Sequence, residues 1–138
     1  MTSRIERFDR AVGLILGKLY EEFPHEMRVL DLTKLDPDAD ADEVELFRQS
    51  LNFLLREGFV NARAIASNAP IYGNVSLTMN TLAMMRRVPD SLQPQVTWGD
   101  RIGTAAKAVA KEGLSVAVRG FLDYAGTHMG LPRRPPET

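Results

Sequence analysis

The chain has 138 residues, 18 of them acidic and 17 basic, and its formal net charge is −1. This length suits one domain, and 44% hydrophobic with 25% charged residues is typical of a soluble globular protein. The absence of cysteine excludes disulfides, thiol catalysis and cysteine-ligated zinc. No apolar run approaches the roughly 18 residues needed to cross a bilayer. The N-terminus lacks a signal-peptide pattern, so we expect a cytoplasmic protein.

Charge is distributed unevenly along the sequence. Residues 1–60 contain 13 acidic and 8 basic side chains, whereas residues 61–138 contain 5 acidic and 9 basic ones. A strongly basic domain would indicate nucleic-acid binding through counterion release alone. Because the net charge of this chain is close to zero, any nucleic-acid contact must use a local basic patch, or a dimer that brings basic residues together.

Helical periodicity marks the N-terminal segment. Apolar residues recur every three or four positions over residues 4–22, which predicts an amphipathic helix. Gly13 and Gly17 lie four residues apart, a spacing that would let another element approach the helix closely. Pro24 ends the helix. Residues 27–32 are short and partly alternating, which predicts a strand, and residues 32–35 fit one helical turn.

An acidic loop follows over residues 36–42, and its alternating aspartates suggest a calcium site. An EF-hand loop needs glycine at position 6 and glutamate at position 12. Counted from Asp36, these positions hold Ala41 and Phe47 instead. We therefore expect a solvated turn that caps the next helix, with Asp40 three residues before a glutamate.

The remaining elements are predicted in chain order. The clearest helix covers residues 43–57, with opposite apolar and polar stripes, and Gly58 follows it as the C-terminal glycine. Turn-forming residues then separate two strand-like arms, which predicts a hairpin over 59–76. A helix over 78–88, capped by Thr78 and ended by Pro89, comes next. Two apolar helices over about 99–111 and 114–126 precede a tail, 131–138, that we expect to be disordered.

This order of elements resembles that of a winged-helix domain. The segment Leu51-Asn-Phe-Leu-Leu-Arg-Glu-Gly-Phe-Val60 resembles the end of the third winged-helix helix running into the wing, and Leu77-Thr78 resembles the start of the helix after the wing. The resemblance covers residues 4–88 and specifies no family within the superfamily. One departure is that the second helix is short or missing between residues 31 and 42.

The resemblance implies a mainly α fold with a small β-hairpin. The winged-helix domain would occupy residues 1–90. Residues 91–130 would form a helical extension that either packs on this domain or forms a dimer interface. Residues 131–138 would be the tail.

The resemblance also implies a DNA-binding surface, since the third helix of winged-helix proteins enters the major groove and the wing contacts the backbone. Arginine, glutamine and asparagine on that helix suit base edges, and arginines elsewhere suit phosphates. The alternative is an ordinary solvated face, on which Arg48 pairs with Glu45. Acidic residues at the start of the helix would also repel phosphates. The candidate DNA-binding residues are Arg48, Gln49, Asn52, Arg56, Arg63, Arg86 and Arg87.

The last two predicted helices contain more apolar side chains than one face of a small domain needs. Winged-helix regulators often dimerise through appended helices, so the resemblance implies a homodimer with paired DNA half-sites. The alternative is that these helices fold back onto the first helix and its glycines. The candidate dimer-interface residues are Val109, Leu114, Val118, Phe121 and Leu122.

No motif indicates an enzyme. The two histidines, His25 and His128, have no carboxylate at catalytic or ligand spacing. The chain has no phosphate-binding glycine loop and no nucleophile motif. We expect no cofactor and no metal. The resemblance therefore implies a homodimeric transcriptional regulator of bacterial or phage type that binds double-stranded DNA; the alternative is a non-enzymatic module that binds another protein.

Overall fold

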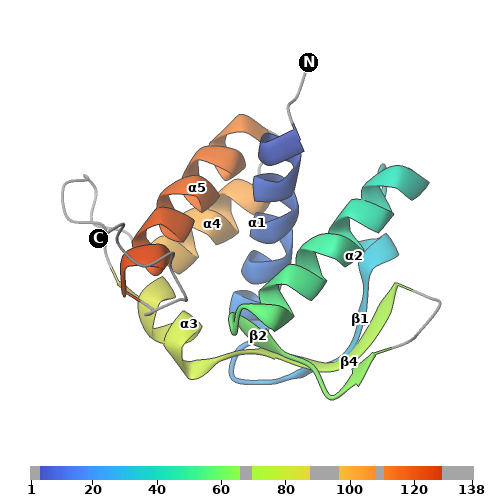
Figure 1. Ribbon diagram of the computed structural model, residues 1–138, viewed down its shortest axis with the longest axis horizontal. Helices are drawn as coiled ribbons and strands as arrows, with labels where there is room; N and C mark the ends of the chain where they lie inside the picture. The colour runs from blue at the N-terminus through green and yellow to red at the C-terminus, as the bar shows by residue number, and fades with distance from the viewer. Residues whose placement is uncertain (1–3, 66–69, 88–96, 108–110, 129–138) are drawn as a thin grey trace, which may run out of the picture.

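The computed structural model describes residues 4–65, 70–87, 97–107 and 111–128. Within these ranges the chain is mainly α with a small antiparallel sheet, which confirms the predicted fold class (Figure 1). In chain order the elements are α1 (Arg4–Glu22), β1 (Met27–Asp31), the 3-10 turn η1 (Leu32–Lys34), α2 (Ala41–Arg56), β2 (Val60–Asn61), β3 (Ala64–Ile65), β4 (Ile71–Leu77), α3 (Met79–Met85), α4 (Trp98–Lys107) and α5 (Lys111–His128).

Strand β4 is the centre of the sheet. On one side it pairs antiparallel with β1, and on the other side it pairs antiparallel with β2 and β3, which are successive pieces of the same hairpin arm. Leu30 of β1 lies opposite Tyr72 of β4, and both side chains are buried in the core. The sheet therefore buries one face and leaves β1 at its edge.

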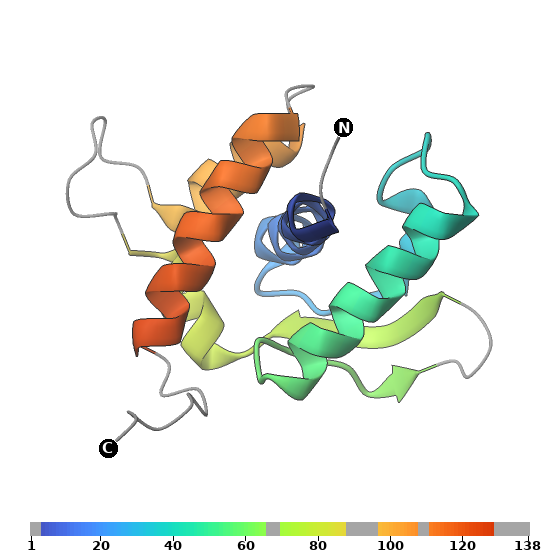
Figure 2. The ribbon, with the colours of Figure 1, turned by 45° about the horizontal axis from the view of Figure 1, so that its top comes forward.

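Helix α1 is the centre of the fold. Figures 1 and 2 show it between the α4–α5 pair on one side and α2 on the other. Ala11, Val12, Ile15 and Leu16 have no solvent exposure. Gly13 and Gly17 are buried as well, so burial extends around the helix beyond the single face that its periodicity predicts, because neighbouring helices cover it from several sides.

The predicted helix caps are confirmed. Asp40 accepts a hydrogen bond at 2.9 Å from the backbone N–H of Glu43, so α2 begins at Ala41, two residues earlier than predicted. Thr78 accepts one at 3.3 Å from the N–H of Thr81. Gly58 has a φ of 83°, a left-handed conformation that glycine adopts without a steric cost and that ends α2.

Three predicted helix boundaries are wrong. Helix α3 ends at Met85, so Arg86 and Arg87 follow it and do not form its last turn. Helix α5 starts before Gly113 and continues past Gly126 to His128, whereas the prediction was 114–126. Glycine costs about 1 kcal/mol in a helix, and the packing of α5 on α1 outweighs that penalty.

Several predictions lie outside the described residues. They concern the turn at 67–69, the connector with Pro89, the side chain of Val109 and the tail at 131–138. Among the described helices, none combines the length and apolarity that a membrane span requires.

Candidate functional site

The exposed face of α2 carries the predicted base-reading residues, and two of them bind an acidic neighbour. Arg48 donates hydrogen bonds of 3.1 Å to both carboxylate oxygens of Glu45, and Gln49 donates a third, of 2.7 Å, to the same carboxylate. These bonds hold the pKa of the Glu45 carboxyl below its usual value. The pairing of Arg48 with Glu45 corresponds to the solvated-face alternative, and it neutralises the charge of this part of the helix.

The other two α2 candidates also contact the protein itself. The side-chain oxygen of Asn52 accepts a hydrogen bond of 2.8 Å from the hydroxyl of Tyr72 in β4, so this residue links the helix to the sheet. Arg56 lies 3.8 Å from the carboxylate of Glu57, and its guanidinium is 5.6 Å from the ring centre of Phe53. Its side chain is nevertheless 69% exposed and accessible to a partner.

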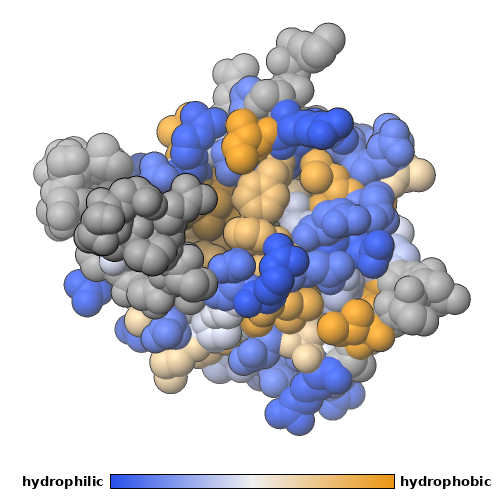
Figure 3. All heavy atoms as spheres, viewed as in Figure 1, coloured by the Kyte–Doolittle hydropathy of each residue, from blue (hydrophilic) through white to orange (hydrophobic). Residues whose placement is uncertain are grey.

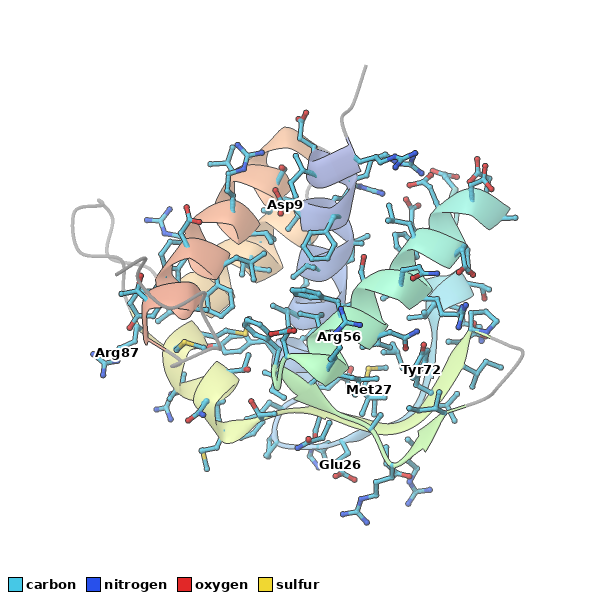
Figure 4. The ribbon with its side chains drawn as sticks, viewed as in Figure 1. Asp9, Glu26, Met27, Arg56, Tyr72 and Arg87 are labelled. Atoms are coloured by element: carbon cyan, nitrogen blue, oxygen red, sulfur yellow. The ribbon has the colours of Figure 1, made fainter. Side chains whose placement is uncertain are left out.

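The remaining arginines come from other elements. Arg63, between β2 and β3, is 76% exposed and lies 3.8 Å from Glu26. Arg86 and Arg87 are exposed at the end of α3. Figure 4 shows Arg87 at the outer end of α3, well apart from Arg56 on α2. Because Arg87 lies apart from Arg56, the predicted cations do not all share one basic surface.

The surface between α5 and α2 is not uniformly hydrophilic. Figure 3 shows hydrophobic residues in this region, bordered by the hydrophilic residues of α2. The rings of Phe8 in α1 and Phe53 in α2 meet edge to face there, with centroids 5.3 Å apart. A DNA backbone approaching α2 would meet this mixed surface and the acidic residues at the start of the helix.

The acidic loop before α2 is held by α1. Arg10 donates to the carboxylates of Asp36 and Glu43, the latter at 3.0 Å, and all three side chains are partly buried. Across the ranges that the structure describes, no group of three acidic or histidine side chains could hold a metal ion.

The candidate dimer interface is largely buried within one chain, so this prediction is corrected for three of its residues. Leu114, Val118 and Phe121 are at most 2% exposed. Leu114 and Val118 lie over Gly13, where a Cβ atom would come within 2.6 Å of both side chains. Leu122 is half-buried against the core. The apolar face of α5 therefore covers α1, as in the alternative considered above, and a homodimer would need another surface.

A concave site lies elsewhere, between α1, the β1–η1 segment and α4, and we call it the β1–α4 cleft. Its volume is about 750 Å³, within the roughly 300–1,000 Å³ typical of ligand sites. Leu14 and Gly17 of α1 form its floor. Val29 and Leu35 line one wall, and Gly103 lines the other. Sequence analysis did not find this cleft, since its residues come from three separate segments.

The charges around the β1–α4 cleft balance. Its lining includes three lysines and three acidic residues. Lys107 of α4 lies 2.6 Å from Glu21 of α1, and this hydrogen bond lowers the pKa of the Glu21 carboxyl. Lys18 lies 3.7 Å from the same glutamate. The cleft thus has a mixed apolar and polar lining whose formal charges cancel.

Small residues keep the α4 wall open. A Cβ atom on Gly17 would lie 3.4 Å from Ala106, in ordinary packing contact, whereas a Cβ atom on Gly103 would have no neighbour within 4 Å. A larger side chain could therefore be placed at position 103, which lines the cleft, without a clash at its Cβ atom.

No family model matches the chain, and no curated protein or solved structure is significantly similar to it.

Proposed function

We propose that this protein is a non-enzymatic interaction module that binds a partner in the β1–α4 cleft. The observation that carries the proposal is the contrast between two surfaces. The cleft is concave and the formal charges of its lining cancel, whereas Arg48 and Gln49 on the face of α2 already bind Glu45. Concave sites of this volume are the usual places for ligand binding.

The order of elements supports classing residues 4–88 as a winged-helix domain. A helix, a short strand, a helical turn, a long helix and a hairpin follow one another in the order that the resemblance implies. The second helix of that pattern corresponds only to the 3-10 turn η1. Winged-helix domains act both on DNA and as protein-binding modules, so the architecture does not choose between the two functions.

Sequence-dependent DNA binding is the second candidate function. It is favoured by Arg56 and Arg63, which are 69% and 76% exposed on α2 and in the hairpin. Against it stand their acidic neighbours, Glu57 and Glu26, and the acidic start of α2. A protein that neutralises few phosphates gains little from counterion release.

The test compares two ligands on the full chain. Peptides are selected from a phage-displayed random library against the immobilised protein, and their binding is compared between wild type, Gly103→Leu and Gly126→Leu. Gly126 is the matched control, because a Cβ atom there also has no neighbour within 4 Å but it lies on α5, away from the cleft. We expect selected peptides to bind wild type and Gly126→Leu but not Gly103→Leu.

Duplex DNA of mixed sequence, titrated at low salt, provides the opposing outcome. Steeply salt-dependent binding that the Arg48→Ala/Arg56→Ala double variant abolishes would overturn the proposal in favour of DNA recognition by α2. Peptides that bind all three proteins equally would show that the β1–α4 cleft is not the binding site.

A further inference from the structure

Strand β1 has a free edge. In the described part of the chain it pairs with β4 alone, which places it at the end of the strand order. A free edge offers unpaired backbone N–H and C=O groups to any other extended chain.

The register determines which residues present these groups. The N–H of Leu32 donates to the carbonyl of Pro70 at 2.9 Å, so this pair is hydrogen-bonded. Hydrogen-bonded and non-bonded pairs alternate along an antiparallel ladder. The pair of Val29 with Gly73 is therefore non-bonded, and Val29 directs its N–H and C=O away from β4. Consistently, the carbonyl of Gly73 accepts a bond of 3.0 Å from Arg63, on the opposite side of β4.

This free edge forms a wall of the β1–α4 cleft. Val29 and Leu30 both line the cleft, although their side chains lie on opposite faces of the strand, 60% and 2% exposed. Successive residues of a strand alternate between faces. The surface that both residues share is the strand's edge, so the outward backbone groups of β1 face the cleft.

The opposite wall leaves room for one side chain, since the space in front of Gly103 is open. The charges of the lining cancel, with lysines at 18, 34 and 107 and acids at 21, 31 and 100. A neutral lining does not favour nucleic acid or another phosphate-rich ligand. The neutral lining instead complements a neutral ligand. A polypeptide segment without net charge is such a ligand, and its backbone has the hydrogen-bond donors and acceptors that the edge of β1 requires.

Building on the proposed function, we infer that the partner of the β1–α4 cleft is an extended, neutral peptide segment that adds to the edge of β1 and inserts an apolar side chain toward Gly103. Main-chain hydrogen bonds to Val29 and Asp31 supply affinity, and the space before Gly103 supplies side-chain selectivity. This is the strand-addition mode of peptide recognition.

The experiment uses synthetic peptides from the library selection described above. Val29→Pro removes one outward N–H but leaves the hydrogen bonds to β4 in place, since proline is tolerated where an edge strand's N–H faces solvent. We expect it to weaken peptide binding about tenfold, as the loss of one hydrogen bond would. The matched control Val29→Ala keeps the N–H and should retain most of the affinity.

Amide hydrogen exchange of the wild-type protein provides a readout that requires no variant. Bound peptide should protect the amides of Val29 and Asp31 from exchange. If binding depends on Gly103 but neither amide is protected and Val29→Pro binds normally, the cleft remains the site and strand addition is wrong. If the peptides also bind Gly103→Leu, the proposed function itself fails.

Discussion

The hydroxyl of Tyr72 donates a hydrogen bond of 2.8 Å to the side-chain oxygen of Asn52, and this bond joins strand β4 to helix α2. The ring of Tyr72 is 1% exposed. Burial raises the pKa of its hydroxyl, which therefore remains protonated as a donor. Asn52, which the sequence predicts to contact base edges, thus holds helix α2 on the sheet.

Replacing Tyr72 with phenylalanine tests this link. We expect Tyr72→Phe to lower the free energy of unfolding by about 1 kcal/mol, because it removes one hydrogen bond and leaves Asn52 without its donor. Urea denaturation followed by circular dichroism measures the change. Tyr20→Phe is the comparison, since none of the residues that the structure describes hydrogen-bonds the Tyr20 hydroxyl, and it should change stability by less than about 0.5 kcal/mol. Equal effects of the two changes would contradict the prediction.

Asp9 should make stability depend on pH. Its side chain is 4% exposed, and burial raises the pKa of its carboxyl, an effect that the Arg119 guanidinium 3.4 Å away only partly offsets. The folded pKa therefore lies above the unfolded one. The stability that Asp9 contributes is full below the unfolded pKa and is lost as pH rises through the folded pKa.

We expect Asp9→Asn to be more stable than wild type at neutral pH, with a difference that shrinks as the solution is acidified. Thermal unfolding between about pH 4 and about pH 8 measures this trend. Arg119 is 53% exposed, so its loss of a partner costs little. A variant that is less stable than wild type at neutral pH would mean that the ion pair outweighs the burial of the charge.

Glycines in two helices should respond oppositely to alanine. A Cβ atom at Gly13 would come within 2.5 Å of Leu114, so Gly13→Ala should destabilise the fold by about 1–3 kcal/mol through overpacking. Gly103→Ala meets open space and should stabilise α4 by up to about 1 kcal/mol. Chemical denaturation of both variants checks the pair. Stabilisation by Gly13→Ala would show that α5 does not pack closely on α1.

The cap of α2 should also be measurable. Asp40 accepts the hydrogen bond from the N–H of Glu43, and Asp40→Ala leaves that N–H without its acceptor. The expected loss is about 1 kcal/mol. Asp38→Ala in the same loop is the matched control, since it removes the same charge and no helix cap. If both substitutions have the same effect, the loop charge and not the cap determines the stability.

The local features of the fold follow from the sequence. Thr78, Asp40 and Gly58 act within a few residues of their own positions, so turn and cap chemistry identifies them. The spacing of Gly13 from Gly17 likewise predicts that another element packs closely on α1. The neighbouring sequence does not show which element this is. The boundaries of α5 are harder to predict from the sequence, because its packing on α1 outweighs the helix-destabilising effect of the glycines within it.

The candidate site depends on longer-range contacts. The pairing of Arg48 with Glu45 is visible at a spacing of three residues, whereas the bond from Tyr72 to Asn52 crosses from the hairpin to the helix. The β1–α4 cleft is less predictable still, since Gly17, Val29 and Gly103 come from three segments. The one sequence signal that points toward it is Gly17, whose spacing from Gly13 predicts close contact with another element.

The position of α1 beneath α5 has a consequence for how the protein is made. Gly13 is covered by Leu114 and Val118, which leave the ribosome long after α1 does. The apolar surface of α1 that α5 covers therefore stays exposed during most of translation. Exposed apolar surface of this kind is prone to aggregation. Nascent chains arrested before α5 should accordingly depend on chaperones, and completion of α5 should release them.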